Sequence, residues 1–171
     1  MNTKIISLII AGLFTASSAM AAEGQTEVSV SGQMDNSSVD GGADTTVTVV
    51  TASLGQYISP LLVVRGNVLL ASTEGSGSTT TLTGVGAGIK FYVAEGAKSA
   101  WVPFALANIN FVSLESGTFN ESGYGASGGV GVSNFITEDV SFDITGEAYS
   151  NTFADSTQDG TRILFGLTAR Y

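Results

Sequence analysis

The sequence predicts an all-β protein, namely an eight-stranded antiparallel up-and-down transmembrane β-barrel. Apolar and polar residues alternate with a period of two through most of the chain after residue 22, which is typical of strands with two different faces. Apolar residues are plentiful, with a mean hydropathy of +0.30. Yet no later segment approaches the roughly 20 consecutive apolar residues that a membrane-spanning helix needs. Spread-out hydrophobicity of this kind favours membrane-crossing strands.

The first 22 residues have the features of a secretory signal peptide. Lys4 precedes a short apolar stretch, residues 5–14, and small residues follow it. Ala19-Met20-Ala21 matches an A-x-A cleavage site, so we expect cleavage after Ala21 or Ala22. The alternative is a membrane anchor, but the stretch is too short and lacks a stop-transfer pattern. We therefore predict a signal peptide over residues 1–22 and a barrel domain over residues 23–171.

Eight strands are expected in the barrel domain, over residues 26–35, 45–56, 61–72, 80–92, 101–111, 124–135, 140–150 and 161–171. The connections between them alternate in character. Four are polar and acidic, at residues 36–44, 73–78, 112–123 and 151–160, and three are tighter or flanked by aromatics, at residues 57–60, 92–100 and 135–139. Bacterial barrels have short periplasmic turns and longer external loops. The acidic loops are therefore predicted to be external, with both chain ends in the periplasm.

Aromatic residues gather near the three tighter turns and the chain end. Amphipathic rings are favoured at membrane interfaces, so these residues are predicted to form a periplasmic aromatic girdle: Tyr57, Phe91, Tyr92, Trp101, Phe135 and Tyr171. A sparser external ring is expected at Phe111 and Tyr124.

The inward face of an eight-stranded barrel encloses a lumen that side chains nearly fill. Seven charged residues are predicted to line it as a charge network: Glu27, Arg65, Lys90, Asp143, Glu147, Arg162 and Arg170. Opposite charges on adjacent strands should pair, which predicts the pairs Glu147–Arg162 and Glu27–Arg170. A gate or ion path is the alternative interpretation, and a structural polar core is the preferred one.

The last strand carries an apolar face that ends at the chain terminus. Counting back in twos gives Tyr171, Ala169, Leu167, Phe165 and Ile163. This face resembles the C-terminal signature of outer-membrane barrel proteins, which the barrel-assembly machinery recognises. Those proteins usually end in Phe, and this chain ends in Tyr. The resemblance implies that these five residues are an assembly signal.

A wider pattern carries a second resemblance. A Gly-rich strand leads into an aromatic-aliphatic turn and a new apolar strand at residues 129–140, and a second copy lies at residues 54–61. This pattern resembles the small OmpA/OmpX-like, porin-family outer membrane β-barrel proteins of Gram-negative bacteria. The resemblance implies a monomer in the outer membrane, in contact with lipid and lipopolysaccharide. It specifies a fold more than a role, since many functions share this scaffold.

The composition argues against most chemistry. The chain has neither histidine nor cysteine, which removes the commonest general base and the usual soft metal ligands. A net charge of −9 disfavours a nucleic-acid partner. Asp143 and Glu147 share one strand face and could in principle perform acid–base work, but balancing lumen cations is the preferred role. No enzyme activity, catalytic residue, cofactor or metal site is expected, and the acidic loops match no calcium-loop motif.

Three functions follow as hypotheses. The leading one is a non-enzymatic outer-membrane barrel that contributes to envelope integrity or surface interaction through its acidic external loops. The second is a narrow passive pore, in which inward glycines leave space beside the charged lumen: Gly84, Gly86, Gly88, Gly129 and Gly131. The third is a secreted soluble barrel that binds an apolar ligand, which would require polar outward faces.

Overall fold

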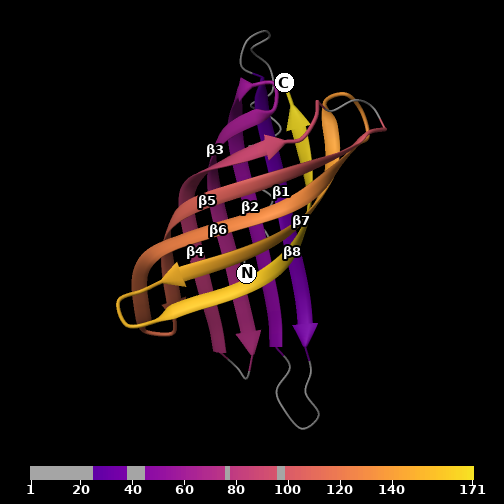
Figure 1. The fold of residues 1–171 in the computed structure, drawn as a ribbon. Helices are drawn as coiled ribbons and strands as arrows, with labels where there is room; N and C mark the ends of the chain where they lie inside the picture. Colours follow the sequence, from indigo (N-terminus) through magenta and orange to yellow (C-terminus); the bar gives the residue numbers. More distant parts are fainter. Residues whose placement is uncertain (1–24, 38–44, 76–77, 96–98) are drawn as a thin grey trace.

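The structure, a computed structural model, describes residues 25–37, 45–75, 78–95 and 99–171. These residues form one antiparallel sheet closed into a barrel (Figure 1). Its strands are β1 (Thr26–Ser37), β2 (Thr45–Ser59), β3 (Leu62–Gly75), β4 (Ser78–Tyr92), β5 (Trp101–Ser116), β6 (Phe119–Phe135), β7 (Val140–Thr152) and β8 (Thr157–Arg170). The predicted all-β fold of eight antiparallel strands is confirmed. The predicted signal peptide and most of the loop 36–44 lie outside the described residues.

Each strand pairs with the next one in the chain, and β8 returns to pair with β1. Thr26 and Tyr171 exchange two backbone hydrogen bonds of 2.8 and 2.9 Å, so the start of β1 lies beside the end of the chain. The β2–β3, β4–β5 and β6–β7 turns lie at this same end, because the strands run up and down in sequence order. No helix in the described part of the chain is long and apolar enough to cross a membrane.

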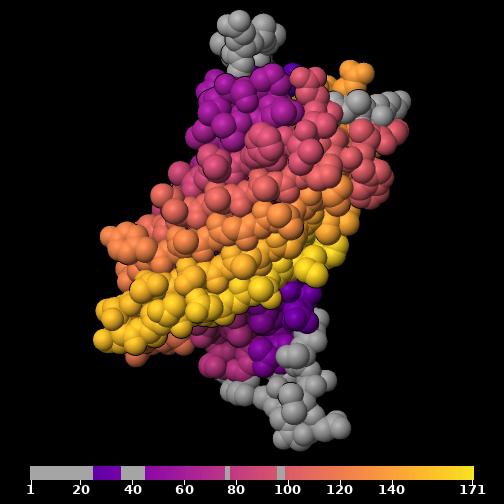
Figure 2. All heavy atoms as spheres, in the orientation of Figure 1, coloured from indigo at the N-terminus to yellow at the C-terminus, as the bar shows by residue number. Residues whose placement is uncertain are grey.

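The outer wall is strongly apolar. Successive side chains on a strand point to opposite faces, and the outward ones include Ile109, Val130 and Ile163, which are 70%, 69% and 56% exposed. Side chains of this size are rarely exposed in contiguous numbers on a protein that is surrounded by water. This wall, seen in space-filling form in Figure 2, is suited to lipid contact and argues against a soluble barrel with polar outward faces.

Three of the predicted acidic loops are shorter than expected, so these predictions were wrong. Residues 73–75 and 78 of the predicted loop 73–78 belong to β3 and β4. Residues 112–123 form a β-hairpin, in which only residues 117–118 separate β5 from β6 and Gly117 has a φ of 60°. Residues 151–160 likewise belong mostly to β7 and β8, with a turn over residues 153–156. Beyond the membrane, both faces of a strand can be polar, so the alternation that marks a strand in the sequence disappears there.

Two apolar clusters lie in the lumen. The cluster towards the chain end, here called the basal cluster, consists of Val63, Tyr92, Val102, Phe104 and Phe135, with Tyr57, Leu61, Ala100 and Leu106 packed against it. The cluster towards the opposite end of the barrel, here called the upper cluster, consists of Val49, Leu69, Leu82, Val112, Phe153 and Leu164. A polar layer separates the two clusters, and it contains charged lumen residues such as Arg65, Glu147 and Arg162.

Candidate functional site: the lumen

Every Lys and Arg that the structure describes lies in the lumen. The chain has six such residues; Lys4 and Lys98 fall outside the described residues, and the others are Arg65, Lys90, Arg162 and Arg170. The carboxylates Glu27, Asp143 and Glu147 point into the same space and are nearly inaccessible, at 2%, 6% and 6% exposure. Four cations thus accompany three carboxylates inside the wall.

Lys90 forms the centre of the lower charge cluster. Its Nζ lies 2.9 Å from Asp143 Oδ2 and 3.5 Å from Glu27 Oε1, and only 2% of its side chain is exposed. The Lys90 ammonium also sits over the rings of Phe104 and Tyr92, at 4.4 and 4.7 Å from the centroids. One cation from β4 therefore connects a carboxylate on β1 with one on β7.

Hydroxyl groups complete the coordination of both carboxylates. Tyr57 and Tyr92 donate hydrogen bonds of 2.9 and 2.7 Å to Glu27 Oε2. Ser141 and Thr168 donate bonds of 2.8 and 2.7 Å to Asp143. Buried charges persist only when they are paired and hydrogen-bonded, and here both conditions are met by residues from separate strands.

A second charge cluster lies higher in the lumen. Arg162 Nε and Nη2 each lie 2.8 Å from Glu147 Oε2. Asn108 Nδ2 donates to Glu147 Oε1 at 3.3 Å, and Asn108 Oδ1 accepts a bond of 3.0 Å from Arg65 Nη2. A continuous polar chain therefore crosses the lumen from β3 through β5 and β7 to β8.

Arg170 does not form the ion pair that the sequence predicts. It is the register partner of Glu27, but its guanidinium carbon lies 4.3, 4.7 and 5.3 Å from the ring centroids of Phe135, Tyr92 and Tyr57. Glu27 instead faces Lys90. Arginine stacks readily on aromatic faces, and three rings are within its reach at the base of the lumen.

The predicted periplasmic girdle is only partly correct. Tyr57 donates to Glu27 inside the lumen, and Phe135 and Tyr92 are each 1% exposed. Tyr92 and Phe135 belong to the basal cluster, and Tyr57 packs against it. Each of the three lies an even number of residues from inward residues of its strand and therefore points into the lumen. Phe91, Trp101 and Tyr171 do face outwards, at 47%, 62% and 39% exposure. The distance of a residue from a turn sets its position along the barrel axis, whereas the alternation along the strand sets whether its side chain points into the lumen or towards lipid.

Side chains from neighbouring strands occupy the space beside several of the inward glycines. A Cβ on Gly86 or Gly88 would overlap the side chains of Asn110 and Asn108, and one on Gly131 would overlap the ring of Phe104. Large side chains from β5 therefore occupy the space that the glycines give up. Asn108 and Phe104 are lumen residues that the sequence alone did not single out.

The lumen carboxylates are committed to cations rather than to each other. Asp143 binds Lys90, and Glu147 binds Arg162. Within the described ranges, no three acidic side chains come together in a way that would hold a metal ion. The geometry is that of a packed ionic core.

The end of the barrel opposite the chain terminus, which the sequence predicts to be external, carries only acidic charge among the described residues. Glu74, Glu115, Asp155 and Asp159 are exposed there, while Glu121 accepts a 2.9 Å hydrogen bond from the Ala154 backbone. Asp40 and Asp44 lie outside the described residues. The four exposed residues are here called the acidic rim.

The outward face of β8 carries the residues of the expected assembly signal. Ile163, Phe165 and Leu167 are 56%, 52% and 54% exposed. Phe165 also stacks on Phe142 of β7, with 6.4 Å between the ring centroids. The strand is apolar towards lipid, whereas its lumen side mixes the apolar Leu164 with the polar Thr168 and Arg170.

A closed antiparallel barrel with an apolar outer wall and an ionic interior defines the class of transmembrane β-barrels. The family model described as "Outer membrane protein beta-barrel domain" matches residues 6–170, so the chain belongs to this family of Gram-negative outer-membrane proteins. No curated protein matches the sequence closely enough to count as a relative.

Solved structures share the fold at low sequence identity. Neisserial surface protein A aligns with a TM-score of 0.62 and 13% identity, over 90% of this chain and 100% of its own. The N-terminal barrel of OprF from Pseudomonas aeruginosa gives 0.57 and 9%, over 89% and 100%. Ail, the attachment invasion locus protein of Yersinia pestis, gives 0.51 and 17%, over 88% and 100%. At these identities the likeness is one of fold alone.

Proposed function

We propose that this protein is a non-conducting, non-enzymatic barrel that contributes to envelope integrity and to surface interaction through its acidic external end. The observation that carries the proposal is the filled lumen. The basal and upper clusters each span several strands, and the ionic layer between them is cross-linked by buried pairs. With a core packed in this way, we expect a stable barrel without a water-filled path along its axis.

The charge distribution supports the surface part of the proposal. All described cations are committed inside the lumen, so the external end attracts cations and repels anions. The chemistry that fits this rim is a positively charged partner, or divalent cations that bridge it to the phosphates of lipopolysaccharide. Because the described turns at residues 117–118 and 153–156 are short, the upper ends of the strands themselves present charges such as Glu115 and Asp159.

Biogenesis is part of the same proposal. Residues 1–22 direct export and are removed, and the outward face of β8 is read by the barrel-assembly machinery. The finished barrel resides in the membrane as a monomer.

One observation favours a narrow pore as a second candidate. Arg65 Nε and Asn67 Oδ1 are buried in the polar layer without a protein hydrogen-bond partner in the described part of the chain. Buried atoms of this kind commonly bind ordered water, and a connected file of waters would conduct ions. The packed clusters above and below this layer argue for isolated waters instead.

Planar-bilayer recording separates the two candidates. The wild-type protein is expected to insert without conductance steps. A variant combining Phe135→Ala and Leu164→Ala removes one large side chain from each cluster and should produce small steps, which proves that insertion is detectable. Steps of equal size from the wild type would favour the pore.

Charge reversal tests the surface role. Glu115→Lys combined with Asp155→Lys should abolish Mg²⁺-dependent binding of the vesicle-reconstituted protein to lipopolysaccharide. The matched control is Glu138→Lys with Asp139→Lys, which reverses two exposed charges at the opposite end of the barrel. Equal loss in both variants would show a general charge effect and contradict the proposed role of the rim.

A further inference from the structure

The ladder between β1 and β8 is shorter than the strands that form it. It runs from Glu27–Arg170 to Gly32–Phe165, although β1 continues to Ser37 and β8 begins at Thr157. The other edge of β8 is paired with β7 as far as Thr152–Thr157. Figure 1 shows β1 and β8 diverging away from the chain end. Within the described residues, the half of this seam away from the chain end is therefore open. It is here called the upper half of the seam, although it lies below the chain end in the view of Figure 1.

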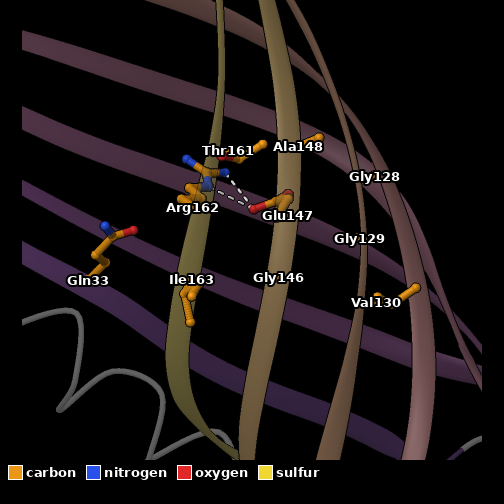
Figure 3. A pocket seen from close by; sticks show the side chains of 10 residues that line it. All are labelled: Gln33, Gly128, Gly129, Val130, Gly146, Glu147, Ala148, Thr161, Arg162 and Ile163. Carbon is orange, nitrogen blue, oxygen red and sulfur yellow. Dashed lines mark hydrogen bonds and ion pairs between the residues drawn. The ribbon is translucent and has the colours of Figure 1, made fainter.

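A hollow lies at the open part of the seam. It has a volume of about 760 Å³ and is lined by Gln33 of β1 and by residues of β6, β7 and β8, including Glu147 and Arg162. In Figure 3, Arg162 and Glu147 point towards each other, and Gln33 stands apart from them. Gln33 Oε1 is buried without a protein partner in the described part of the chain. The hollow thus separates two strand edges that both lack a neighbour.

The seam opens near the outer boundary of the apolar wall. Met34 and Ile163 are outward apolar residues, 68% and 56% exposed, and the next outward residue on β8 is the polar Thr161. Unpaired backbone groups are costly in hydrocarbon, which is why membrane-spanning sheets close. Pairing of the open strand edge at this height would therefore lower the free energy of the barrel in the membrane.

The sequence supplies that partner in the existing register. Extending the ladder beyond Gly32–Phe165 places Gln33 opposite Leu164, Met34 opposite Ile163 and Asp35 opposite Arg162. The faces agree, because Met34 and Ile163 both point to lipid, while the other pairs point to the lumen. Asp35 and Arg162 carry opposite charges, and directly opposed charges of this kind stabilise a strand pair.

We propose that the upper half of the β1–β8 seam is a lateral gate that closes by extending this ladder without a change of register. In the open state Arg162 binds Glu147, and Asp35 is exposed. In the closed state Asp35 competes with Glu147 for the Arg162 guanidinium. Opening connects the hollow to the outer leaflet sideways, a route distinct from conduction along the barrel axis.

Disulfide trapping tests the gate, since the chain has no native cysteine. Thr26–Tyr171 is a doubly hydrogen-bonded pair, so by alternation Gln33–Leu164 would be a non-hydrogen-bonded pair, whose closer side chains favour a disulfide. The test variant combines Gln33→Cys and Leu164→Cys. The control combines Ser29→Cys and Thr168→Cys, a pair of the same type within the existing ladder.

Cross-linking is measured in lipid vesicles under mild oxidation, after heat-dependent gel mobility has shown that each variant is folded. The control pair should cross-link rapidly, and the test pair more slowly but to completion. Asp35→Asn should slow the test pair and Glu147→Gln should accelerate it, each by about threefold, and neither should change the control pair.

Three results would overturn the proposal. Absence of cross-linking in the test pair would mean a seam fixed open. Cross-linking of the test pair as fast as the control would mean a seam that is already closed. An intermediate cross-linking rate that changes in neither Asp35→Asn nor Glu147→Gln would show that Arg162 does not control the opening of the seam.

Discussion

Replacing Lys90 by Met should destabilise the barrel more than any other loss of a single charge from its lumen. Lys90 is 2% exposed and is the only ion-pair partner of both Glu27 and Asp143 among the described residues. Met preserves the length of the side chain and its contact with the aromatic rings, so the substitution isolates the charge. Removing one partner from a buried ion pair costs about 3–5 kcal/mol.

The structure places the expected cost near the lower limit of that range. Glu27 keeps hydrogen bonds from two tyrosines, and Asp143 keeps bonds from Ser141 and Thr168. These four hydroxyls stabilise the carboxylates after the ammonium is lost. We therefore expect Lys90→Met to lower the free energy of unfolding by about 3 kcal/mol.

A double-mutant cycle tests whether the cost arises from the stranded charges. Asp143→Asn removes one of them, so the double variant should lose less stability than the sum of the single variants, with a coupling energy of about 2 kcal/mol. Urea titration in lipid vesicles, followed by the fluorescence of the single tryptophan, measures each unfolding free energy. Glu138→Gln, at an exposed turn, is the neutral control. Additive losses, or a Lys90→Met variant as stable as the wild type, would refute the reasoning.

Three further predictions concern the wall, the packing and the assembly of the barrel. Trp101 faces outwards near the periplasmic turns, so its fluorescence should be quenched more by lipids brominated near the headgroup than by lipids brominated near the chain end. Gly131→Ala should cost about 1–3 kcal/mol in urea titrations, because the new Cβ would overlap the ring of Phe104. Gly128→Ala, on the outward face, should be neutral, and equal losses would contradict this packing argument. Tyr171→Ser should reduce the amount of heat-modifiable barrel in the outer membrane while Tyr171→Phe keeps it, and normal yield from Tyr171→Ser would exclude a role in assembly.

The strands and their faces could be predicted because the membrane imposes a simple rule on them. An outward side chain within the hydrocarbon must be apolar, so β3 and β8 reveal their faces directly in the alternation of their residues. The rule stops where the strands leave the membrane. The hairpin at residues 117–118 was missed for this reason, since pairing outside the membrane makes no demand on the polarity of either face.

The aromatic residues show a different limit. Tyr57 and Phe135 lie at the height of the lower interface, as predicted, but their parity points them into the lumen. A count in twos along β6 from the inward Gly131 reaches Phe135, so the sequence did contain the signal. The girdle prediction used distance from a turn and overlooked this count.

Contacts across the lumen could not be predicted from the sequence, because they depend on the shear of the closed sheet. Glu147 and Arg162 lie on adjacent strands, where hairpin register alone brings them opposite each other. Lys90 on β4 meets Asp143 on β7, and no local pattern relates these two strands. Their meeting is set by how far the register advances around the whole ring. The register shift accumulated around the sheet must be accommodated where β1 pairs with β8. A difference between the paired lengths of these two strands therefore leaves unpaired residues at this seam. A barrel can therefore pack a fixed ionic core in its lower half and still keep a movable edge above it.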